Sequence, residues 1–228
     1  MNNRIPGVIR LHFRDKFTWL YLPWIIALLN MAVNLLVSVF LTETMIYSGG
    51  IATIYVFLLV MGILSMNQPF ALALGFGLRR TDYYWGTMAT AVVMSVLYAV
   101  LTMAFGAVER WTNYWWERMR FFDVPYFNDG SLPEQFVVML SFMLHFFLIG
   151  FVVSCTYRRF GRNGLFILFS ALMLALMIAA YACMYYGWWD DIFGWLAGNT
   201  AFETSLWLFL PTAAYALIAY ALMRRTTA

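Results

Sequence analysis

The sequence predicts an all-α, polytopic membrane protein with six transmembrane helices, both termini in the cytoplasm and an interfacial helix at the N-terminus. Hydrophobic residues make up 64% of the 228 residues and charged residues only 11%, whereas a soluble domain is about half apolar and about a quarter charged. Six segments have the roughly 20 mostly apolar residues that are needed to cross a bilayer. Because no Pro-, Ser- or Gly-rich linker separates them, we expect a single domain over residues 1–228.

The predicted spans follow the apolar runs of the chain, at residues 20–41, 51–74, 86–108, 135–156, 164–187 and 205–223. Before the first span, apolar and charged side chains mix between Val8 and Trp19, a composition typical of a segment lying on the inner membrane surface. This stretch lacks an apolar run ending in a small-residue cleavage site. We therefore expect residues 1–19 to be a cytoplasmic interfacial segment and not a removable signal peptide. The two cysteines, Cys155 and Cys183, fall near opposite ends of neighbouring spans, too far apart for a disulfide within the chain.

Basic residues gather on one side of this six-span arrangement. Eleven of the 14 Lys and Arg residues flank the same ends of the spans: Arg4, Arg10, Arg14, Lys16, Arg79, Arg80, Arg158, Arg159, Arg162, Arg224 and Arg225. The other three fall on the opposite side, together with most of the acidic residues. Because basic loops next to spans stay in the cytoplasm, the pattern predicts an even number of spans with cytoplasmic ends.

Two loops on the outer side are rich in aromatic residues, at 109–134 and 188–204. Aromatic rings prefer the headgroup level of a membrane, so we expect both loops to lie on or dip into the outer leaflet. Two interpretations stay open for them. They form either an ordinary aromatic belt or a surface at which a substrate is released.

The predicted spans contain no Asp, Glu, Lys or Arg. Carriers coupled to protons or sodium usually place ionisable groups at membrane depth, where the coupling ion needs a ligand. His145, near the middle of the fourth span, is the exception. It is either a proton relay or a neutral side chain hydrogen-bonded to a neighbouring helix.

Four amide side chains are further candidates for a substrate path or a helix interface. Asn30 and Asn34 are four residues apart and share one face of the first span, where they either join two helices or touch a polar part of a substrate. Asn67 and Gln68 precede Pro69 near the inner end of the second span. Since proline leaves a backbone carbonyl without its helical donor, we expect a local break there.

Sequence motifs of enzymes are missing: there is no phosphate-binding loop, zinc-protease motif, Cys-x-x-Cys pair or nucleophile elbow. We therefore expect no catalytic residue, no metal site and no cofactor bound by this chain. Energy for uphill transport would have to come from another chain.

A short basic segment, residues 70–86, joins the second and third spans. Its glycines suit a tight reversal, and we expect Thr81 or Asp82 to cap the helix that follows. Arg79 and Arg80 stand where a peripheral partner could reach them. The segment is either a docking element or a plain basic turn.

This segment resembles the coupling helix of permease subunits in bacterial ATP-binding cassette (ABC) transporters of the exporter type, whose ATPases are separate chains. The matching positions are Phe70, Leu74, Gly75, Leu78, Arg79, Arg80, Thr81, Tyr83, Tyr84 and Gly86. The layout of an interfacial helix, six spans and a bent outer segment at 188–204 is also similar to that family. The long aromatic loop 109–134 departs from its pattern.

The resemblance implies an ATPase-docking loop formed by Gly75, Leu78, Arg79, Arg80, Thr81, Asp82, Tyr83 and Tyr84. It also implies a second six-span permease as dimer partner, ATP and Mg on the ATPase subunit, and a place in the bacterial cytoplasmic membrane among its lipids. The expected function is export of an amphipathic or hydrophobic compound, peptide or lipid along the dimer interface, with no nucleic-acid partner. Two alternatives remain, the substrate-capturing subunit of a vitamin importer and a membrane scaffold or sensor that transports nothing.

Overall fold

Helices make up most of the described residues in the computed structural model, which describes residues 4–40, 46–115 and 119–224. The predicted all-α class is therefore confirmed. The helices are α1 (Arg4–His12), a π-helical turn η1 (Phe17–Tyr21), α2 (Leu22–Phe40), α3 (Ala52–Leu64), α4 (Gln68–Gly75), α5 (Arg80–Trp111), α6 (Leu132–Tyr186), α7 (Trp188–Gly198) and α8 (Ala201–Arg224). Two short strands, β1 (Ile46–Tyr47) and β2 (Met119–Arg120), pair in parallel.

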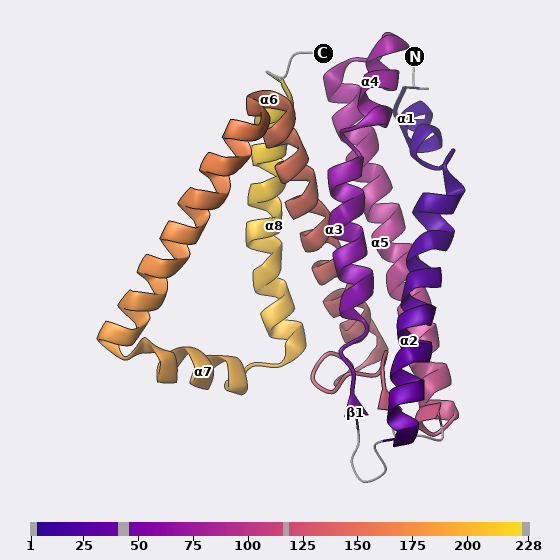
Figure 1. The fold of residues 1–228 in the computed structure, drawn as a ribbon, viewed down its shortest axis with the longest axis vertical. Coiled ribbons are helices and arrows are strands. Elements are labelled where there is room, and N and C mark those ends of the chain that lie inside the picture. The colour runs from indigo at the N-terminus through magenta and orange to yellow at the C-terminus, as the bar shows by residue number, and fades with distance from the viewer. Residues whose placement is uncertain (1–3, 41–45, 116–118, 225–228) are drawn as a thin grey trace.

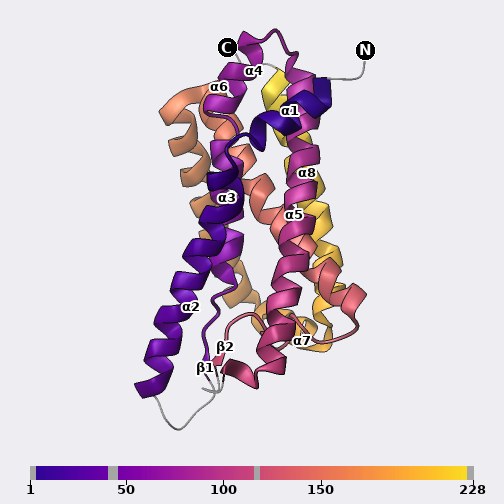
Figure 2. The ribbon, with the colours of Figure 1, turned by 90° about the vertical axis from the view of Figure 1, so that its right-hand side faces the viewer.

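The long helices run along a common direction, and the start of α1 and the end of α8 lie at the same end of the bundle, beside α4 (Figure 1). We call this the terminal end and the other, where β1 and α7 lie, the opposite end. Helix α1 lies crosswise over the terminal end (Figure 2). Among the described residues, five helical stretches are long and apolar enough to cross a membrane: Phe17–Phe40, Ala52–Gly75, Arg80–Trp111, Leu132–Tyr186 and Ala201–Arg224.

The longest stretch, α6, folds back on itself at Gly161 (Figure 1). Gly161 has φ 67° and ψ −164°, a backbone conformation that L-residues with a side chain rarely adopt. The predicted spans 135–156 and 164–187 fall on the two arms of this bent helix. The first arm packs within the bundle, and the second diverges from α8 until α7 joins them at the opposite end.

The second arm of α6 and helix α7, residues 162–198, are called the wing here. None of its residues is buried, and large apolar side chains cover it. Cys183 lies in the wing and Cys155 is buried in the first arm of α6; both thiols are free. The wing therefore presents an apolar surface that no other described part of the chain covers.

The predicted break before Pro69 is present, since α3 ends at Leu64 and α4 begins at Gln68. Between them, Asn67 has a non-helical backbone, with φ −80° and ψ −111°. Pro69 has no N–H to donate to the carbonyl of Ser65. The hydroxyl of Tyr83 donates to that carbonyl instead.

The prediction that Thr81 or Asp82 caps the third long helix is wrong. Helix α5 begins at Arg80, and Arg79 occupies the cap position in an extended conformation without a side-chain capping bond. The chain reverses direction at Gly77, which has φ +74°, so the helix starts before the residues suited to cap it. Asp82 lies within the first turn, where the positive end of the helix dipole stabilises its negative charge. Its carboxylate pairs with Arg4 at 3.2 Å.

Helices α3 and α6 cross in close contact through two glycines. A Cβ on Gly62 would lie 2.1 Å from the carbonyl oxygen of Phe147, and a Cβ on Gly150 would lie 2.0 Å from that of Leu59. Small residues at such crossings let helix backbones approach each other, as in membrane helix pairs generally. This crossing forms the centre of the bundle.

Candidate functional site

The candidate site is the turn of residues 70–86 at the terminal end, which we call the α4–α5 turn. Its tip is exposed: Phe76 is 72% accessible to solvent, and Gly75 and Arg79 are also exposed. Leu78, Arg80, Thr81 and Asp82 are partly buried. The tip therefore combines an aromatic ring and a guanidinium group that another protein can contact.

Tyr83 lies at the base of the turn and is fully buried. Its hydroxyl donates to the Ser65 carbonyl at the α3–α4 break, as described above. Its ring packs edge-on against Phe70 at a centroid distance of 5.1 Å and lies 5.7 Å from the ring of His12. Tyr83 therefore fastens α5 to the break, and its side chain is not part of the exposed tip.

Tyr84 makes the corresponding contact to the other side of the bundle. It is 5% exposed, and its hydroxyl donates to the carbonyl of Ala216 in α8 at 3.0 Å. Its ring also packs edge-on against Tyr220, with centroids 5.1 Å apart. Neighbouring tyrosines thus connect the start of α5 to two helices that are far apart in the sequence.

Gly86, the last position of the motif, holds helix α1 against α5. A Cβ on Gly86 would lie 2.4 Å from the Cβ of Val8, which is itself fully buried. One turn further along α1, the Nε2 of His12 lies 3.2 Å from the hydroxyl of Thr87. The absence of a side chain at Gly86 therefore allows the crosswise placement of α1.

Positive charge surrounds the turn. A hollow of about 440 Å³ lies beside it, lined by Leu74, Leu78, Arg79, Arg80, Thr81 and Arg224. The guanidinium of Arg80 donates to the carbonyl of Arg224 at 3.4 Å, so the turn also contacts the end of α8. Such a rim attracts acidic surfaces.

The other predicted residues form separate contacts. Asn30 donates to the hydroxyl of Thr53 at 2.7 Å, which joins α2 to α3. Asn34 donates to the side-chain oxygen of Asn30 at 2.7 Å, within α2. The Nδ1 of His145 lies 2.9 Å from the hydroxyl of Thr212 in α8. The contacts of Asn30 and His145 match the interhelical alternative, whereas Asn34 bonds within its own helix.

Asn67 and Gln68 are exposed at the α3–α4 break. Both line a cavity of about 690 Å³ that faces the segment after α1. Of the four predicted amides, Asn67 and Gln68 are therefore the two that line this cavity.

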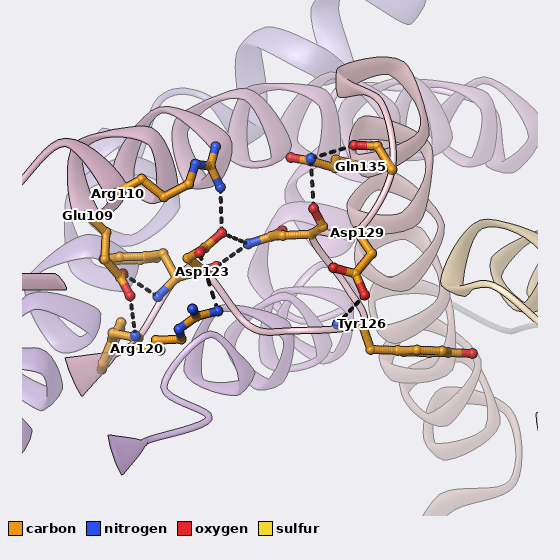
Figure 3. Close-up of polar contacts among 11 residues, drawn as sticks. Glu109, Arg110, Arg120, Asp123, Tyr126, Asp129 and Gln135 are labelled. Atoms are coloured by element: carbon orange, nitrogen blue, oxygen red, sulfur yellow. Dashed lines mark hydrogen bonds and ion pairs between the residues drawn. The ribbon is translucent and has the colours of Figure 1, made fainter. Parts of the chain in front are cut away.

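A polar cluster at the opposite end was not predicted from the sequence (Figure 3). The carboxylate of Glu109, which is fully buried, accepts hydrogen bonds from the backbone N–H groups of Phe121 and Phe122 at 2.8 Å and 2.7 Å. Asp123 accepts from Arg110 and from Asn128, and lies 3.8 Å from Arg120. These bonds fix the loop after β2 against the end of α5.

The cluster corrects one expectation about the aromatic loops. Phe121 and Phe122 are fully buried within the protein, so they do not belong to a belt at the membrane surface. Trp111, in contrast, is 87% exposed. A glutamate directly after an apolar span is a signal for such a cluster, because a carboxylate at that depth needs several donors.

Among residues 4–40, 46–115 and 119–224, no group of three or more His, Cys, Asp or Glu side chains is arranged to hold a metal ion. Comparison of the chain with family models, with curated proteins and with solved structures gave no match. The resemblance of the α4–α5 turn to a coupling helix therefore rests on its own residues and on their placement.

Proposed function

We propose that the chain is the membrane-spanning permease subunit of an ATP-driven ABC transporter of the exporter type, with the ATPase on a separate chain that docks on the α4–α5 turn. The observation that carries this proposal is the division of the turn into an exposed tip and a buried base. The tip offers Phe76 and Arg79 to a partner, and the base is bonded to α3 through Tyr83 and to α8 through Tyr84. A partner that moves the tip would move the helices behind it.

The proposed topology has six crossings, with each arm of α6 counted as one and both termini in the cytoplasm. Its support is the charge distribution: residues 4–16, the α4–α5 turn, the bend of α6 and residues 224–225 carry 11 of the 14 Arg and Lys residues. Basic segments beside spans favour the cytoplasmic side. In this topology α1 lies along the inner membrane surface.

The source of energy follows from the composition of the helices. The predicted spans lack carboxylates, ammonium groups and guanidinium groups, so a coupling ion would find few ligands at membrane depth. We therefore assign the driving force to ATP and Mg bound by the partner ATPase. The resemblance to bacterial permease subunits gives the cytoplasmic membrane of a bacterium as the proposed location.

The proposed substrate is an amphipathic or hydrophobic compound, peptide or lipid that moves along the interface with a second permease. The wing supports this choice, because residues 163–189 contain no charged side chain and are largely exposed. An exposed apolar surface of this kind suits contact with lipid tails, with apolar cargo or with another helical subunit.

The proposal is tested by purifying the tagged chain from its native cell membranes in mild detergent and identifying what accompanies it. We expect an ATPase to copurify with the wild type and to be lost when Phe76→Ala and Arg79→Ala are combined. Arg10→Ala is the matched control, since Arg10 is an exposed basic residue of α1 outside the turn. Retention of the ATPase by the double variant would contradict docking at the turn.

A second experiment tests the topology and the alternatives. A cysteine introduced as Phe76→Cys in a Cys183→Ser background should react with a membrane-impermeant maleimide only after the cells are opened. Labelling in intact cells would place the turn outside and refute the proposal. A substrate-capturing subunit would instead bind a small ligand tightly without any ATPase, and a scaffold would keep its activity in the Phe76 and Arg79 variants.

A further inference from the structure

A cavity of about 690 Å³ lies at the terminal end, between the segment after α1 and the α3–α4 break. One wall carries His12, Arg14 and Asp15, and the facing wall carries Asn67 and Gln68. The cavity is next to the ends of two long apolar stretches, Phe17–Phe40 and Ala52–Gly75. In a membrane with the terminal end at its surface, lipid headgroups would reach this cavity, and its volume suits a small ligand.

His12 is the unusual side chain of this cavity. It is only 1% exposed, and its Nε2 pairs with the hydroxyl of Thr87, but its Nδ1 has no hydrogen-bond partner among the described residues. Buried polar atoms are nearly always paired, and this Nδ1 is closed off from solvent as well as unpaired. Burial also lowers the pKa of His12 to about 4, so the imidazole is neutral at physiological pH.

Arg14 and Asp15 bring one positive and one negative charge to the same wall. Both side chains are exposed, and Arg14 has no ion-pair partner in the described part of the chain. Asp15 accepts a hydrogen bond from the backbone N–H of Thr18 at 3.1 Å, and its hydrogen bonds with Thr18 lower the pKa of this carboxyl. A ligand that bears both an anion and a cation would satisfy both groups.

We propose that this cavity binds the headgroup of a phospholipid that carries a primary amine. The guanidinium of Arg14 donates to the phosphate, and the carboxylate of Asp15 accepts from the ammonium. The inference does not depend on transport or on an ATPase, because it requires only that the terminal end lies at a membrane surface.

The site predicts selectivity among headgroups. Phosphatidylcholine has a quaternary ammonium without an N–H, and phosphatidylglycerol has hydroxyl groups but no cation, so neither can donate an ammonium N–H to Asp15. A charge-assisted hydrogen bond corresponds to about a tenfold difference in affinity. We therefore expect about tenfold stronger retention of phosphatidylethanolamine than of either other lipid.

The test is native mass spectrometry of the full chain, purified in detergent and mixed with each lipid at equal concentration. Arg14→Gln should reduce retention of all three lipids. Asp15→Asn should abolish the preference for phosphatidylethanolamine over phosphatidylcholine. Lys16→Gln should change nothing, because Lys16 is an exposed basic residue that does not line the cavity. All three positions are exposed, so these variants leave the buried packing intact.

Equal retention of the three lipids by the wild type would overturn the proposal. So would an effect of Lys16→Gln as large as that of Arg14→Gln, because the attraction would then be a general effect of charge. A competition arm identifies the source of the headgroup. If soluble phosphoethanolamine or inorganic phosphate displaces the lipid at millimolar concentration, the ligand is a soluble phosphate compound and the assignment to a lipid is refuted.

Discussion

The close crossing of α3 and α6 allows a quantitative prediction for two single-methyl changes. In Gly62→Ala the new Cβ would lie 2.1 Å from a backbone oxygen of α6, and in Gly150→Ala it would lie 2.0 Å from a backbone oxygen of α3. Ordinary contact begins at 3.4 Å, so the helices must separate by about 1.3 Å. Overpacking costs about 1–3 kcal/mol, and we expect about 3 kcal/mol for each variant, because the obstacle is backbone and cannot rotate away.

The free energy of unfolding can be measured by titrating the detergent-purified chain with sodium dodecyl sulfate and following its helical circular dichroism. Gly194→Ala in α7 is the matched control, since a Cβ there would meet nothing within 4 Å. Alanine is about 1 kcal/mol better than glycine inside a helix, so the control should be neutral or slightly stabilising. The double variant of Gly62 and Gly150 should cost less than the sum of both, because one separation relieves both clashes. Wild-type stability of Gly62→Ala would refute the close crossing.

Three further changes test the contacts at the two ends of α5. Tyr83→Phe removes the donor to Ser65 and should destabilise the chain by about 1–3 kcal/mol in the same titration, because a buried carbonyl is left unpaired. Burial lowers the pKa of His12 to about 4 from 6.5. The contribution of His12 to stability should therefore be complete above pH 6.5 and should fall by on the order of 3 kcal/mol as the pH falls towards 4. His12→Gln should flatten this pH dependence. Glu109→Gln turns an amide NH₂ towards a backbone N–H and should cost about 2 kcal/mol, with faster proteolysis of residues 119–131.

Local chemistry explains which parts of the fold the sequence predicts well. The apolar runs predict the long helices, because a run of about 20 apolar residues leaves few other structures open to it. Pro69 also predicts the α3–α4 break, because the loss of one backbone donor at a proline is independent of the rest of the fold. The start of α5 differs from the prediction, because the backbone geometry of Gly77 and Arg79, and not a capping side chain, determines where the helix begins.

Contacts between distant segments are the part that sequence reasoning missed. Nothing in the apolar pattern distinguishes Gly62 and Gly150 from other glycines until α3 and α6 are placed against each other. Glu109 falls at the start of the predicted outer loop 109–134, and its partners are backbone groups of Phe121 and Phe122, which carry no sequence signature. The position of Glu109 after an apolar span therefore signals that donors are needed, but not which groups supply them.

The candidate site shows the same contrast between features that the local sequence predicts and features that depend on packing. The motif predicts an accessible basic turn, and Arg79 is indeed exposed at its tip. Which tyrosine faces which helix depends on packing, and the structure buries both Tyr83 and Tyr84 at the base. For Asn30 two interpretations were open, and its bond to Thr53 favours the interhelical one.

Helix α5 connects the two polar regions of the molecule. It runs without interruption for 32 residues, about 48 Å at the usual rise, from the α4–α5 turn to the cluster around Glu109. At its start it is bonded to the α3–α4 break through Tyr83 and to α8 through Tyr84, and near its end Glu109 holds the loop that follows β2. Under the proposed function, a partner that displaces the turn would displace α5 as a body, because a continuous helix resists stretching. The buried base of the turn and the buried carboxylate at the other end are then the two attachments that carry this motion across the membrane.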